Sequence, residues 1–90
     1  MLKLKRAFRK LQAKLHGGWE LIGYSLEGYD WIKEDLRDVP KWVQKVAFTY
    51  DDFGAYYIKG KTFIYKVIVE PGYGQGYRNY YFYRKLRRKS

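Results

Sequence analysis

Residues 62–70 read Thr-Phe-Ile-Tyr-Lys-Val-Ile-Val-Glu, the part of this 90-residue chain where β-branched and aromatic residues are most concentrated. This composition predicts a strand. Alternate residues of a strand point to opposite faces, so one face is wholly apolar and the other mixes apolar with charged side chains. The apolar face consists of Phe63, Tyr65, Val67 and Val69. Because both faces carry apolar residues, we expect this strand to lie inside a sheet.

Turn signals on both sides of this strand predict its neighbours. A Lys-Gly-Lys sequence at residues 59–61 precedes it, and a glycine-rich loop at residues 71–76 follows it. Glycine and proline favour tight turns, and strands that follow one another in sequence usually pair. We therefore expect residues 55–59 and residues 77–85 to form antiparallel strands on either side of the central one.

The rest of the chain predicts further elements. Leucine and phenylalanine recur every three or four positions in residues 2–15, which predicts a basic amphipathic helix. Residues 19–26 predict a strand, residues 31–39 a short helix and residues 42–50 another strand. Together these elements predict an α+β fold in a single domain spanning residues 1–90. Its antiparallel sheet would have about four to five strands, with an N-terminal amphipathic basic helix and a short second helix.

The net charge of +10 is distributed unevenly along the chain. Residues 1–15 contain six basic and no acidic residues, and residues 78–90 contain six basic and no acidic residues. Residues 17–77 contain seven basic and nine acidic residues, so the middle of the chain is slightly negative. A nearly neutral body with two cationic arms favours a partner with a phosphate backbone. The acids within residues 31–39 indicate a side that such a partner avoids.

Both arms supply the candidate nucleic-acid-binding residues, together with two tyrosines of the last predicted strand. Lysine and arginine neutralise phosphates, and tyrosine rings stack on unpaired bases. Residues 84–90 form the basic C-terminal tail. The candidates are Lys3, Lys5, Arg6, Arg9, Lys10, Lys14, Arg78, Tyr81, Tyr83, Arg84, Lys85, Arg87, Arg88 and Lys89.

Several other function classes find no support in the sequence. The chain has no cysteine and one histidine, which excludes thiolate catalysis and cysteine zinc sites and leaves a carboxylate-only metal site as an unsupported alternative. No motif indicates a cofactor or a catalytic residue, and we expect none. Residues 55–62 fit a relaxed phosphate-loop pattern, but Tyr-Tyr-Ile-Lys favours a strand where that loop needs a flexible turn. No apolar run approaches the roughly 20 residues that span a bilayer, and we expect a cytoplasmic location. The basic helix leaves binding to an anionic membrane surface as an alternative.

Three functions fit these features. In its bias against amides, cysteine and methionine, the chain resembles the small ribosomal proteins of heat-loving archaea. That resemblance implies a non-enzymatic protein bound to ribosomal RNA (rRNA), with neighbouring ribosomal proteins as further contacts. In size, charge and its late Tyr/Arg-rich strand the chain is similar to toxins of the RelE family, which implies cleavage of messenger RNA without metal. Its size and charge also fit small archaeal chromatin proteins, which implies binding to duplex DNA.

Overall fold

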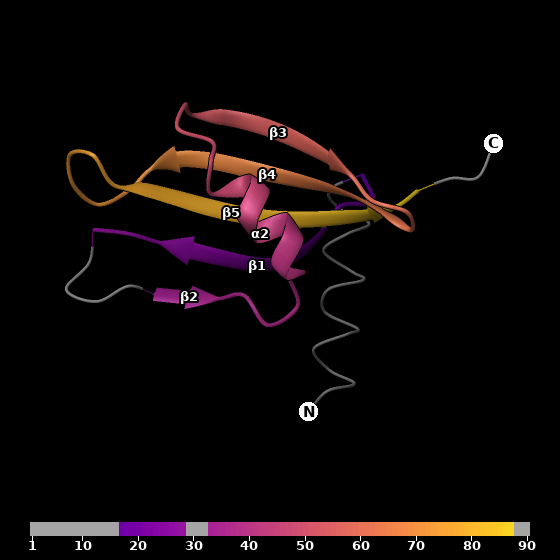
Figure 1. The fold of residues 1–90 in the computed structure, drawn as a ribbon. Coiled ribbons are helices and arrows are strands. Elements are labelled where there is room, and N and C mark those ends of the chain that lie inside the picture. Colours follow the sequence, from indigo (N-terminus) through magenta and orange to yellow (C-terminus); the bar gives the residue numbers. More distant parts are fainter. Residues whose placement is uncertain (1–16, 29–32, 88–90) are drawn as a thin grey trace.

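The computed structural model describes residues 17–28 and 33–87, which form a five-stranded antiparallel sheet with one short helix (Figure 1). The order across the sheet is β2-β1-β5-β4-β3, so β2 and β3 form its two edges. The elements in chain order are β1 (Glu20–Leu26), β2 (Lys33–Asp35), α2 (Lys41–Ala47), β3 (Gly54–Lys59), β4 (Phe63–Pro71) and β5 (Arg78–Leu86).

The strand predicted at residues 62–70 is confirmed as β4, and its expected antiparallel neighbours are confirmed as β3 and β5. Val67 at the middle of β4 lies opposite Tyr56 of β3 and Phe82 of β5. Val67 and Phe82 are completely buried. The dense β-branched and aromatic sequence therefore forms the centre of the β3–β4–β5 half of the sheet.

A single hydrophobic core lies between α2 and one face of the sheet, which we call the α2 face. Val43 and Ala47 are four residues apart on α2, and both are fully buried between the helix and this sheet face. A fully buried valine such as Val43 contributes about 1.5–3 kcal/mol through removal of apolar surface from water, and the smaller Ala47 contributes less. The other core residues are Ile22, Val39, Ile58, Tyr65, Val67, Val69, Tyr80 and Phe82.

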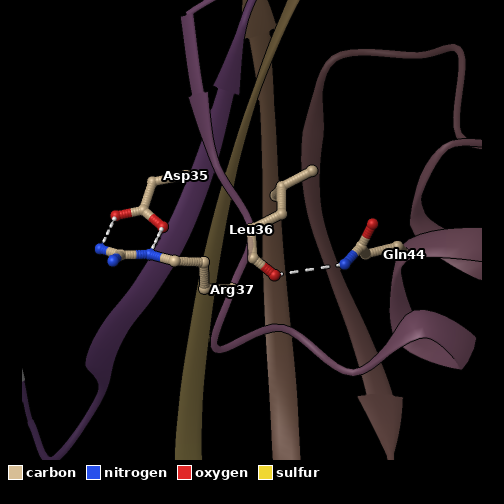
Figure 2. A network of polar contacts seen from close by, with 4 residues as sticks. All are labelled: Asp35, Leu36, Arg37 and Gln44. Carbon is tan, nitrogen blue, oxygen red and sulfur yellow. Dashed lines mark hydrogen bonds and ion pairs between the residues drawn. The ribbon is translucent and has the colours of Figure 1, made fainter.

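The segment between β2 and α2 is held by side-chain hydrogen bonds, shown in Figure 2. The amide nitrogen of Gln44 donates to the carbonyl oxygen of Leu36 at 3.3 Å, the bond drawn in the figure. It also donates to the carbonyl oxygen of Val39, at 2.9 Å. From the turn that follows β2, the Arg37 guanidinium donates to both carboxylate oxygens of Asp35, at 3.0 and 3.1 Å. The two Gln44 bonds hold α2 to the segment that follows the edge strand, and the Asp35–Arg37 pair is local to that segment.

The α+β prediction with two helices is wrong for the described residues, because the sheet dominates and α2 is a short helix elsewhere in the chain. Residues 31–39 were expected to be helical, yet Lys33–Asp35 forms β2. The unpaired backbone groups along the outer edge of β1 offer these residues ladder hydrogen bonds, with Leu26 opposite Lys33.

Residues 42–50 were expected to form a strand, and this is also wrong. Lys41–Ala47 forms α2, with Pro40 at the N-cap position. Proline suits the start of a helix because the missing N–H has no partner there in any case. The predicted helix at residues 2–15 lies outside the described residues. No described helix is both long and apolar enough to cross a membrane.

Candidate nucleic-acid interface

Basic side chains gather at one end of the sheet. There β1 begins, β5 ends and the β3–β4 turn closes, with Glu20 opposite Arg84 and Phe63 opposite Leu86. Figure 1 shows the start of β1, the β3–β4 turn and the end of β5 together on the right. We call this region the cationic end. Its basic residues are Lys59, Lys61, Lys66, Arg84, Lys85 and Arg87.

Most acidic residues of the described structure lie away from this end. At the opposite end, where the β4–β5 loop closes, stand Glu27, Asp51, Asp52 and Glu70; we call this the acidic end. Glu34 and Asp35 lie on the β2 edge, and Asp38 lies in the turn between β2 and α2. Among the described residues, Glu20 is the carboxylate at the cationic end. This separation of charge along the strands gives one end a positive field that attracts a polyanion.

The described chain also begins and ends at the cationic end. A side chain at Gly18 would meet the Lys85 side chain at 3.2 Å, and the Arg87 backbone N–H donates to the Thr62 carbonyl at 2.9 Å. Residues 1–16 and 88–90 are therefore attached to the chain at this end. They hold eight of the candidate binding residues, which lie outside the described residues: Lys3, Lys5, Arg6, Arg9, Lys10, Lys14, Arg88 and Lys89.

Aromatic rings and ammonium groups alternate on the sheet face opposite α2, which we call the far face. The Lys66 ammonium lies 4.8 Å from the Trp19 ring centroid and 5.0 Å from that of Tyr83. The Lys85 ammonium lies 5.8 Å from the same Trp19 ring. Tyr57, whose ring centroid is 5.8 Å from that of Trp19, is 61% exposed. These five residues, the Trp19 cluster, combine cations for phosphates with an exposed ring for a base.

Both candidate tyrosines lie on the far face. Tyr81 stands opposite Ile68, and Tyr83 stands opposite Lys66. Both are half-buried. Burial, with smaller effects of Glu70 and Tyr81, raises the pKa of Tyr83. A protonated tyrosine hydroxyl both donates and accepts hydrogen bonds, and the raised pKa keeps Tyr83 in that form to a higher pH than an exposed tyrosine.

The candidate arginines of β5 are divided between the two ends of the sheet. The Arg84 Nε donates to a Glu20 carboxylate oxygen at 3.2 Å, and its guanidinium lies 4.5 Å from the Phe63 ring centroid. Arg78 lies at the acidic end, where its Nε donates to the Asp51 carbonyl at 2.6 Å. The structure thus brings Tyr83, Arg84, Lys85 and Arg87 together and does not bring Arg78 to them.

Sequence reasoning missed the contribution of the middle of the chain. Lys59, Lys61 and Lys66 belong to a segment that is acidic on balance, and Trp19 precedes the first strand. Antiparallel pairing is what places Lys66 beside Trp19 and Tyr83. The sequence did contain a signal for this grouping, the two-residue period of a strand. Tyr57 and Lys59 lie two residues apart and therefore share a face, and Lys66 lies on the face opposite its apolar neighbours in sequence.

Comparison of the chain with protein-family models, with curated proteins and with solved structures gives no match. Within the described residues, no three His, Cys, Asp or Glu side chains gather closely enough to hold a metal ion. The structural features that bear on function are the cationic end and the Trp19 cluster beside it.

Proposed function

We propose that this protein binds RNA without cleaving it, and that its target in the host is ribosomal RNA. The observation that supports the proposal is the charge of the cationic end, where six basic side chains stand with one carboxylate among the described residues. The described chain enters and leaves the structure at this end, at Gly17 and Arg87. Such a surface binds a polyanion by neutralising phosphates and releasing counterions.

The Trp19 cluster favours RNA with unpaired bases over a duplex. A ring face is useful for stacking only when the base has left its own stack, as in loops, bulges and single strands. Tyr57 offers such a ring at the sheet edge, and Lys59 follows it two residues later on the same strand. A phosphate bound at Lys59 would leave its neighbouring base within reach of Tyr57.

The test is fluorescence anisotropy with a labelled RNA hairpin that has a single-stranded loop, measured over a series of salt concentrations. The triple variant Lys59→Gln/Lys61→Gln/Lys85→Gln removes three charges from the cationic end. Its matched control, Lys33→Gln/Lys41→Gln/Lys45→Gln, removes the same charge from exposed positions on β2 and α2. Each lost phosphate contact lowers the slope of log affinity against log salt by about 0.7, so the first triple should lower it by about 2.

The control triple should keep the slope of the wild-type protein. Equal losses in both triples would contradict the proposal, because binding would then follow net charge and not the cationic end. Cleavage of the hairpin would favour the RNA-cleaving toxin instead. Tighter binding to duplex DNA of any sequence than to the hairpin would favour a chromatin protein.

The ribosomal target is tested by sucrose-gradient sedimentation of the tagged protein from its own host at low salt. We expect the wild-type protein to sediment with ribosomal subunits and the cationic-end triple to shift toward the top. A wild-type protein that stays at the top of the gradient would overturn the ribosomal assignment. RNA binding itself would still be tested by the anisotropy measurement.

A further inference from the structure

A cleft of about 580 Å³ lies at the cationic end, between the start of α2 and the β3–β4 turn. Its volume is within the range of small-ligand sites, roughly 300–1,000 Å³. Three aromatic and three basic side chains line it, and no acidic residue does. The six are Trp42, Phe63, Tyr65, Lys59, Lys61 and Arg87.

The aromatic wall of the cleft is held in place. The Trp42 ring meets the Tyr65 ring edge-on, with centroids 5.8 Å apart and planes at 88°. Tyr65 is 7% exposed and anchored in the core, whereas Trp42 is 47% exposed. An indole packed along one edge and open elsewhere is suited to stacking on a flat ring.

Gly60 brings the turn close to this wall. A side chain at Gly60 would meet the Phe63 carbonyl oxygen at 2.9 Å and Tyr65 at 3.2 Å, so no larger residue fits without movement. The Arg87 guanidinium donates to the Gly60 carbonyl at 3.1 Å, which fixes it beside the cleft. An arginine has five N–H donors, so others remain for a phosphate.

We propose that this cleft receives one unpaired nucleotide of the bound RNA. Its base stacks on Trp42, and its phosphate contacts Lys59, Lys61 and Arg87. The inference rests on the proposed RNA binding and adds a base-binding site on the α2 side of the sheet. Lys59, at the end of β3, lines this cleft and also follows Tyr57 of the Trp19 cluster, so the two base sites share one phosphate contact. A free mononucleotide has the same chemistry, so the experiment distinguishes the two sources.

The first measurement is NMR titration of the tryptophan indole N–H signals, assigned by single Trp→Phe variants. We expect AMP to shift the Trp42 signal and ribose 5-phosphate at the same concentration to shift it much less, because the base makes the contact. A labelled single-stranded RNA should shift the same signal at a lower concentration than AMP. Equal affinities for AMP and the RNA would overturn the assignment to RNA.

The second measurement is anisotropy with Trp42→Leu and with Tyr77→Leu, an equally exposed aromatic at the acidic end. Stacking of a base on an aromatic ring is worth about tenfold in affinity. Trp42→Leu should therefore weaken RNA binding by about tenfold with an unchanged salt slope, since no charge is lost. Tyr77→Leu should bind as the wild-type protein does.

Cross-linking of 4-thiouridine RNA to the wild-type protein covers the case in which Trp42→Leu folds poorly. The inference predicts a cross-linked peptide that contains Trp42 or Tyr65. Wild-type affinity in Trp42→Leu, or cross-links confined to other peptides, would overturn the cleft while the salt dependence still supported RNA binding. Loss of RNA binding by the wild-type protein itself would instead remove the proposed function.

Discussion

The hydroxyl of Tyr80 donates a hydrogen bond to the backbone carbonyl oxygen of Tyr50 across 2.9 Å. Tyr80 is 4% exposed and lies on β5, while Tyr50 follows α2, so this bond joins the helix connection to the centre of the sheet. Phe48 packs edge-on against the same Tyr80 ring, with centroids 4.9 Å apart. The end of α2 is thus fixed by one polar and one aromatic contact to a single residue.

Burial is the main cause that raises the pKa of Tyr80, and Arg78 opposes it. Because the folded pKa is above the unfolded value, the stability from Tyr80 is fully present below about pH 10 and is lost as pH rises further. We expect Tyr80→Phe to cost about 1 kcal/mol at pH 7, from the lost hydrogen bond, and to flatten the decline in stability above pH 10. Urea unfolding at several pH values measures both, and an unchanged alkaline decline would contradict the prediction.

Gly28 is a position where a side chain cannot be accommodated. Its φ is +95°, and a methyl group there would lie 2.0 Å from the Tyr73 carbonyl oxygen in the β4–β5 loop. Gly28→Ala should therefore lower the free energy of unfolding by about 2–5 kcal/mol, from backbone strain and the forced displacement of that loop.

Gly76→Ala is the matched control for this substitution. Gly76 also has a positive φ, +86°, but nothing lies within 4 Å of an added methyl group. This variant should lose only the strain component, about 1–2 kcal/mol. Thermal unfolding of both variants tests the difference, and equal losses would show that the contact with Tyr73 is relieved without cost.

Gln44 supports the connection between β2 and α2 through two donated hydrogen bonds, one to Leu36 (Figure 2) and one to Val39. Gln44→Leu leaves the Leu36 and Val39 carbonyls without this donor, and we expect a loss of about 1–3 kcal/mol. Lys45→Met, at an exposed neighbouring position on α2, should change stability by less than about 0.5 kcal/mol. Urea unfolding compares them, and a Gln44 variant as stable as the Lys45 variant would argue against a structural role for the amide.

The sequence predicted the part of the fold in which composition and turn chemistry agree. For β4, the composition, the alternation of side chains and the flanking turn residues all predicted a strand. The short turn at residues 59–61 then required β3 to pair with it antiparallel. Residues 42–50 were harder, because Trp42, Val46, Phe48 and Tyr50 alternate as in a strand. Val43 and Ala47, which also recur at helical spacing, decide the outcome because they are the residues that the core buries.

For the candidate site, the sequence predicted the kind of residue but not the grouping. A list of basic residues at both termini includes Arg78, which pairing in β5 carries to the acidic end. The same list omits Lys59 and Lys61, because two lysines in a turn between strands do not stand out in the sequence as a cluster of charge. Strand register determines which of these residues meet, and register depends on the core that forms on the opposite face.

Glu20 provides the sharpest test of the charge separation, because its carboxylate accepts from Arg84 at 3.2 Å within the cationic end. Glu20→Gln removes one negative charge there and keeps an oxygen for Arg84. The pair is partly exposed, so the variant should lose less than about 1 kcal/mol of stability.

RNA affinity, however, should rise by up to about fivefold, since one unit charge at about 4 Å is worth about 1 kcal/mol in water. Release of Arg84 to a phosphate would also steepen the salt slope by about 0.7. Glu27→Gln removes the same charge at the acidic end and should leave both quantities near the wild-type values. Anisotropy titrations of the two variants decide the matter: if they gained affinity equally, the position of the charge along the strands would be irrelevant to binding.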